Sequence, residues 1–203
     1  AKLTATGSSL KPALAIDAAL SDLSKADERL TGVANLNAQV TGDLNSPNVR
    51  GTLSLDKATA AGRPIRHLQL DLNGTDVLGQ ARVALKLDGD VDNRAARGAV
   101  QVSKADAGWT IAPSDLTIGR VAITGNATVT PSGLANGTIK INAPSLEDLS
   151  AFALRDMQGR LNADITLIGK DGAQSVEINA NGSAIRAGDI AVSLLDVRGK
   201  GLD

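Results

Sequence analysis

The chain has 203 residues, of which 42% are hydrophobic and 1% aromatic, with a net charge of −1 and no cysteine. The dispersed charge and scarce aromatics leave neither a basic stripe nor a stacking platform for nucleic acid, and disulfides and thiolate sites are excluded. Because the first residue is Ala1, we expect the chain to be a piece of a longer protein.

Apolar and polar residues alternate along most of the chain, which is typical of strands with one apolar face. The alternating runs lie at residues 14–20, 36–40, 49–55, 68–72, 81–87, 100–102, 109–111, 116–118, 121–123, 127–129, 139–141, 161–167, 176–180 and 190–197, the last with a shift of phase at Leu195. Hairpin turns are predicted at Asn73-Gly74, Asp88-Gly89, Asn136-Gly137, Asp171-Gly172 and Asn181-Gly182. Strands joined by such turns are antiparallel neighbours, so the pattern predicts an all-β meander.

One short helix is expected near 145–154, in the segment SLEDLSAFAL. Ser145 is its expected N-cap, and Asp148 stands where a capping box has Glu or Gln. The expected apolar face carries Leu146, Leu149, Phe152 and Ala153. A weaker helical pattern at 17–29 leaves that segment undecided.

The chain is interpreted as a single elongated β segment over 1–203, containing two similar units at about 30–75 and 155–203. LNAQVTG from Leu36 resembles LNADITL from Leu161, which begins 125 residues later. Two structures would cover the apolar face, and the alternation is compatible with both. One is a second sheet, as in a sandwich, and the other is the same sheet curled around an aliphatic groove.

Candidate catalytic and metal-binding residues are few. His67 is the single histidine and lies on the polar face of its strand, where a surface role is expected. Asp88, Asp90 and Asp92 resemble the start of a calcium loop, but Asn93 replaces the glycine that such a loop requires. A hairpin explains this stretch better. We predict no enzyme activity, no catalytic or metal-binding residues and no cofactor.

The segment from Val40 to Gly74, VTGDLNSPNVRGTLSLDKATAAGRPIRHLQLDLNG, resembles the repeating signature of the TamB family within the AsmA-like proteins. The resemblance rests on a strand ending at Gly42, a GDLNSPNVRG turn with Pro47 and Gly51, the strand TLSLDKATA and the closing LQLDLNG. It implies an open, curled sheet, a β-taco, with an aliphatic interior.

The resemblance also implies a function. TamB-like proteins are anchored in the inner membrane of Gram-negative bacteria, span the periplasm and work with an outer-membrane barrel, TamA. They are implicated in phospholipid transport and in outer-membrane protein assembly. We therefore expect a phospholipid or other acyl-chain ligand, a TamA-like partner, and membrane contact through parts of the parent protein outside this segment.

The expected groove-lining residues are selected from the apolar members of the alternating runs. They are Leu36, Val40, Leu53, Leu55, Leu68, Leu70, Leu72, Val83, Leu85, Leu87, Val100, Val102, Ile139, Ile141, Leu161, Ile165, Val176 and Ile178. The alternative hypothesis is a closed β-sandwich or solenoid module of a secreted bacterial adhesin, with a structural role and no ligand.

Overall fold

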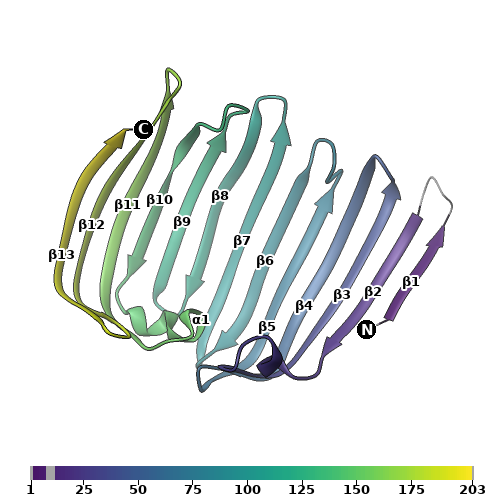
Figure 1. Cartoon of the computed structure of the whole chain (residues 1–203), viewed down its shortest axis with the longest axis horizontal. Coiled ribbons are helices and arrows are strands. Elements are labelled where there is room, and N and C mark those ends of the chain that lie inside the picture. The colour runs from purple at the N-terminus through teal and green to yellow at the C-terminus, as the bar shows by residue number, and fades with distance from the viewer. Residues whose placement is uncertain (1, 8–11, 203) are drawn as a thin grey trace.

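A computed structural model describes residues 2–7 and 12–202 as one antiparallel sheet of thirteen strands. Strands adjacent in sequence are adjacent in space across the whole sheet (Figure 1). The strands are β1 (Lys2–Gly7), β2 (Pro12–Leu20), β3 (Leu30–Asp43), β4 (Ser46–Ala60), β5 (Arg63–Thr75), β6 (Arg82–Val91), β7 (Arg94–Ala105), β8 (Gly108–Ile118), β9 (Val121–Val129), β10 (Ala135–Ala143), β11 (Met157–Lys170), β12 (Ala173–Ala187) and β13 (Ile190–Leu202). The predicted all-β antiparallel meander is confirmed.

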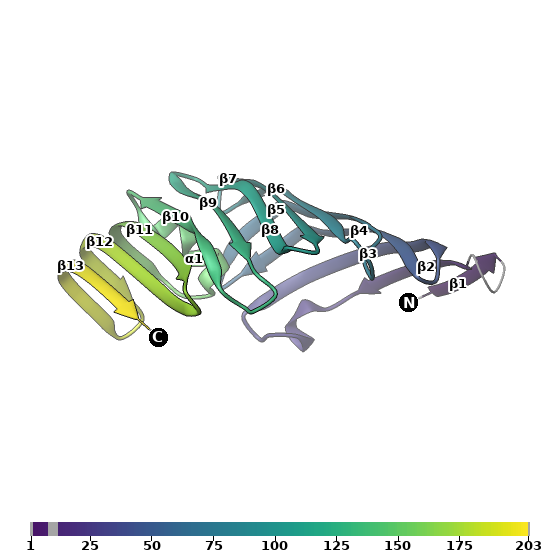
Figure 2. The same cartoon turned by 90° about the horizontal axis from the view of Figure 1, so that it is seen from above.

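The sheet is curved and open. Figure 2 shows an arch, with its crest near β6 to β8 and both edges bent to the same side. Within the described residues β1 and β13 are the two edges of the sheet and do not pair with each other, and no second sheet covers either face. Of the two coverings left open by the sequence, the curled single sheet is therefore the one observed.

Helical structure is limited to short segments at one end of the strands. These are the 3-10 turns η1 (Leu23–Lys25) and η2 (Leu146–Leu149) and the α-helix α1 (Ser150–Ala153). In the undecided region 17–29, β2 continues to Leu20 and η1 follows. None of the helices in the described ranges has the length and hydropathy needed to cross a bilayer.

The helix predicted near 145–154 is present, but its details differ from expectation. Its first half is η2, and the Ser145 side chain forms no capping hydrogen bond. Phe152 is exposed, whereas Ser150 and Ala151 are buried. The 3-10 turn has three residues per turn instead of 3.6, which rotates the following residues away from the face predicted for a regular α-helix.

Most of the predicted glycine turns are wrong. Asn73-Gly74, Asp88-Gly89, Asn136-Gly137 and Asn181-Gly182 lie inside β5, β6, β10 and β12, and of the five pairs only Asp171-Gly172 forms a turn. A Cβ atom at Gly89 would lie 2.6 Å from the carbonyl oxygen of His67, and one at Gly137 would lie 2.2 Å from that of Asn126. These glycines therefore permit close approach between neighbouring strands of the curved sheet.

Two further turn predictions can be compared with the structure. A hairpin is present in place of a calcium loop, but its turn is shorter than the predicted one between Leu87 and Gly98, because β6 continues to Val91 and β7 begins at Arg94. The turn residues Asp92 and Asn93 have φ angles of 54° and 59°. Two successive positive φ angles are typical of a type I′ hairpin turn. The turn expected around Pro47 is shorter than predicted, because β4 already begins at Ser46. The Pro47 carbonyl accepts a hydrogen bond from the Val77 N–H at 3.0 Å.

Strands β3 to β5 and β11 to β13 match in length and in the position of one bulge. Every boundary of the second set lies 127 residues after that of the first, as the starts of β3 at Leu30 and β11 at Met157 illustrate. A glycine with positive φ interrupts the register in each set, Gly32 at 106° and Gly159 at 97°. This structural offset of 127 residues differs by two from the offset of 125 residues between the similar segments LNAQVTG and LNADITL. The division of the chain into two units stays a prediction.

Candidate functional site

The strand registers place apolar side chains in continuous rows across one face of the sheet. In the longest row Leu36 lies opposite Leu53, Leu53 opposite Leu70, and Leu70 opposite Leu87. The row continues through Gly98, Leu116, Ile123, Ile141, Ala163, Ala180 and Val197. Neighbouring strands are about 4.8 Å apart, so thirteen strands give a sheet about 58 Å wide. The apolar surface extends over most of that width.

All eighteen predicted groove residues lie on this same face, because their cross-strand partners belong to this row or to parallel rows two residues away. Leu72, Leu85 and Val100 form such a second row. The helical segments at the end of the strands pack against this face, and Figure 2 shows α1 on the inner side of the arch. The apolar face is therefore the concave one, and we call it the groove.

The middle of the groove is uncovered. Leu36, Leu70 and Ile178 keep 39%, 37% and 39% of their surface accessible, although they lie inside β3, β5 and β12. Large apolar side chains at the centre of a long sheet are normally covered by a second layer. Here they line an open trough.

A hollow in the groove lies where β6, β7 and β8 adjoin. It has a volume of about 340 Å³ and is lined by Leu70, Leu85, Leu87, Gly98, Ala99, Val100, Ser114, Asp115, Leu116 and Ile123. Gly98 has no side chain at a position whose two neighbours in the row are Leu87 and Leu116. A bulge between Ile111 and Ser114 also interrupts the pairing of β8 with β9.

Leu116 and Ile123 were not among the predicted groove residues. Each belongs to an apolar alternation that was visible in the sequence. Val100 and Val102 of the preceding strand were predicted to line the groove, but only the register of β8 with its neighbours shows that Leu116 and Ile123 share their face.

One end of the groove is closed by the helical segments. Leu23 of η1 and Ala151 of α1 share an apolar cluster with Ile65 and Val91. Leu146 of η2 packs in a second cluster with Val121 and Ala143. The Arg29 side chain, which follows η1, donates a hydrogen bond to the Leu154 carbonyl at 3.3 Å. Two connections that are far apart in the sequence thus meet at this end, which we call the capped end.

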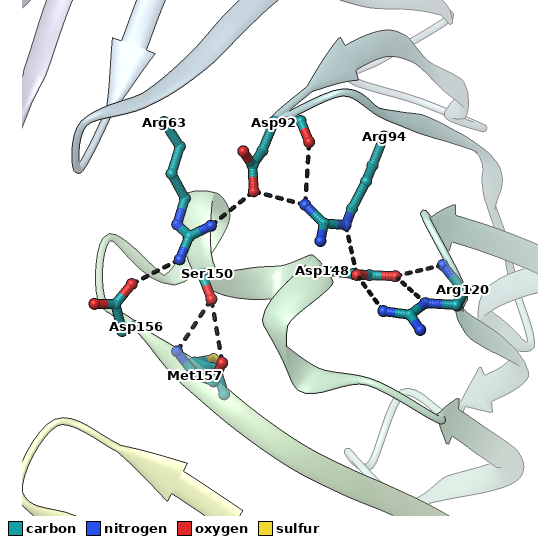
Figure 3. Close-up of polar contacts among 8 residues, drawn as sticks. All are labelled: Arg63, Asp92, Arg94, Arg120, Asp148, Ser150, Asp156 and Met157. Atoms are coloured by element: carbon teal, nitrogen blue, oxygen red, sulfur yellow. Dashed lines mark hydrogen bonds and ion pairs between the residues drawn. The ribbon is translucent and has the colours of Figure 1, made fainter.

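A buried carboxylate holds η2 to the sheet (Figure 3). The Asp148 side chain is 1% exposed and pairs with Arg94 Nε at 2.5 Å and with Arg120 Nε at 3.2 Å. It also accepts a hydrogen bond from the Arg120 backbone N–H at 2.7 Å. Burial by itself raises the pKa of Asp148, but the hydrogen bonds from Arg120 and the charges of Arg94 and Arg120 outweigh it, so the pKa is lowered.

The ion pairs continue from Arg94 across the capped end. Arg94 and Arg63 both bind Asp92, at 2.6 and 2.7 Å, and Arg63 also binds Asp156 at 2.6 Å. Asp156 follows α1, so the network joins both ends of the helical segment to the hairpins of the sheet (Figure 3). This arrangement fixes a wall of the groove at the capped end.

The opposite end of the groove, the open rim, carries one aromatic residue on its concave side. Trp109 of β8 is 42% exposed, and Lys104 Nζ of β7 lies 5.8 Å from the centroid of its ring. The two residues are cross-strand partners. The geometry is that of a cation–π contact.

The remaining candidate chemistry is sparse. His67 lies at the surface, with Nδ1 3.2 Å from the Asp56 carboxylate. Among the described residues no group of three or more histidines, cysteines or carboxylates is placed to bind a metal ion.

Comparison of this chain with protein-family models, with curated proteins and with solved structures finds no match.

Proposed function

We propose that this chain is a periplasmic segment of a bridge between the inner and outer membranes, and that its groove carries phospholipid acyl chains. The observation that carries the proposal is the uncovered aliphatic surface. It runs from strand to strand across the sheet, and Leu36, Leu70 and Ile178 are open to a ligand along it.

The energetics of the groove suit the passage of lipid. Each methylene exposed to water costs about 0.8 kcal/mol, so two acyl chains of about 16 carbons cost on the order of 20 kcal/mol. Contact with rows of Leu, Ile and Val removes much of this cost. Such contacts are non-directional, individually weak and repeated along the row. A conduit requires these properties, and it requires no catalytic residue.

The resemblance of Val40–Gly74 to the TamB and AsmA-like signature supports the wider setting. For the parent protein it implies an inner-membrane anchor outside this segment, a TamA-like outer-membrane partner and a share in outer-membrane protein assembly.

The alternative, a closed adhesin module without a ligand, fits the structure less well. A closed core needs a second layer over the leucines of β3 to β6, and the described residues form a single sheet whose covering is confined to the capped end.

Photo-crosslinking in cells tests the proposal. A photoreactive amino acid replaces Leu70 or Leu85 on the groove face. In the controls it replaces Gln69 or Lys86, which lie on the convex face of the same two strands. We expect lipid adducts at the two leucine positions and none at the controls. If all four variants are folded and well expressed but give no lipid adduct, the conduit hypothesis is wrong for this segment.

A further inference from the structure

The open rim carries an isolated positive charge at the mouth of the apolar groove. Along the described strands, the positions in register with the groove rows carry charged residues only at the capped end and at Lys104. Asp115 adjoins the hollow, but its cross-strand partners Ala99 and Thr124 belong to the convex face. The other basic residues of the strands lie on the convex face, as Lys86 does opposite Asp71, or join the ion pairs of the capped end.

The Lys104 ammonium is available to a ligand. It forms no ion pair with any described residue, and its side chain rests over the exposed Trp109 ring. The nearest acidic residue in sequence is Asp106 in the following turn, and its carboxylate accepts a hydrogen bond from the Gln80 amide at 3.1 Å. An indole beside an ammonium offers both an amphipathic ring and a charge at the boundary between apolar surface and water.

A continuous apolar path leads from this pair to the hollow between β6 and β8. Val102 and Ile111 lie next to Lys104 and Trp109 on the same face, and Gly98 and Leu116 follow in the hollow. Six residues of strand separate Lys104 from Gly98, which corresponds to about 20 Å. This distance suits an extended long acyl chain.

We propose that the groove selects amphiphiles with an anionic headgroup. The carboxylate or phosphate pairs with Lys104, the region next to the headgroup lies on Trp109, and the acyl chain passes over Val102 and Ile111 into the hollow. This inference rests on the proposed function and adds to it the charge of the ligand and the position of its headgroup.

The test uses Trp109 as a reporter, because it is the only tryptophan in the chain. The chain is titrated with dodecanoate, dodecyl phosphate and uncharged dodecyl maltoside, all below their micelle concentrations, while the emission wavelength and intensity are followed. The variants are Lys104→Gln and, as a matched control, Lys86→Gln on the convex face of the adjacent strand. Circular dichroism checks that both variants fold.

We expect an anionic probe to bind about 2- to 5-fold more tightly to the wild type than to Lys104→Gln, as for an exposed ion pair. Dodecyl maltoside should bind the wild type and both variants equally, and Lys86→Gln should match the wild type throughout. Raising the ionic strength to about 0.5 M should remove the anionic preference. A preference for dodecyl phosphate supports a phospholipid headgroup, and a preference for dodecanoate supports a free fatty acid.

Two results would overturn the inference in distinguishable ways. If all three probes bind and Lys104→Gln changes none of the affinities, the groove hypothesis stands and headgroup selection is wrong. If no probe binds and Leu70 yields no lipid adduct in cells, both the selection and the proposed function are wrong.

Discussion

Replacing Asp148 with asparagine should release the wall at the capped end of the groove. The side chain keeps its size but loses the charge that binds Arg94 and Arg120, in a position where only 1% of it is exposed. Breaking a buried ion pair from one side costs about 3–5 kcal/mol. The side chains of Arg94 and Arg120 are 28% and 61% exposed, so water partly compensates the freed guanidinium groups. We therefore expect the lower end of this range, a loss of about 3 kcal/mol of unfolding free energy.

Urea unfolding followed by circular dichroism measures this loss, with Glu147→Gln as the control. Glu147 adjoins Asp148 but is exposed, so its substitution should change the unfolding free energy by less than about 0.5 kcal/mol. If Asp148→Asn also stays within about 0.5 kcal/mol of the wild type, the ion pairs do not hold the helical segment, and the reasoning is refuted.

The same comparison has a defined pH dependence. Because the pKa of Asp148 is lower in the folded chain than in the unfolded chain, its contribution is present above the unfolded pKa and is lost as the pH falls through the folded value. The difference in unfolding free energy between the wild type and Asp148→Asn should therefore be full at neutral pH and should shrink on acidification below 3.8, the ordinary pKa of an aspartate. A difference that stays constant down to the acid transition would contradict the assignment.

Three further substitutions test the backbone, the helical segment and the groove. Gly108→Ala should lower the unfolding free energy by about 1–3 kcal/mol or more, because the φ angle of Gly108 is 115° and the new Cβ would lie 2.0 Å from a carbonyl oxygen. Gly62→Ala is the control: a Cβ there meets open space, so the loss of unfolding free energy in the same urea assay should be smaller. Ser150→Ala leaves the Met157 N–H without its 3.0 Å partner at a fully buried site and should lower the unfolding free energy by about 1–2 kcal/mol; an unchanged urea midpoint would contradict this. Leu70→Asn should lower the unfolding free energy by only about 1 kcal/mol, because the Leu70 side chain is 37% exposed. The same substitution should weaken the binding of dodecyl maltoside in the Trp109 fluorescence titration, and unchanged binding would argue against the groove.

The glycines show where local sequence reasoning fails in this protein. Asp88-Gly89 and Asn136-Gly137 have the composition of hairpin turns, yet both lie within strands. Turn propensity describes what a dipeptide permits, and a curved sheet uses the same freedom to let backbones approach closely. Only the positions of the neighbouring strands separate the two uses.

The sequence by itself determined the class of the fold and the composition of the groove. Strict alternation assigns every second residue to one face of a strand, so the eighteen predicted lining residues could be named without coordinates, and all lie on the concave face. Tertiary structure alone decided what covers that face. Some features depend on residues far apart in the sequence: the meeting of η1 with α1 and the pairing of Asp148 with two arginines. Others depend on the register between strands: the curvature of the sheet and the position of Lys104 beside Trp109. Periodicity within a single strand contains no information about either.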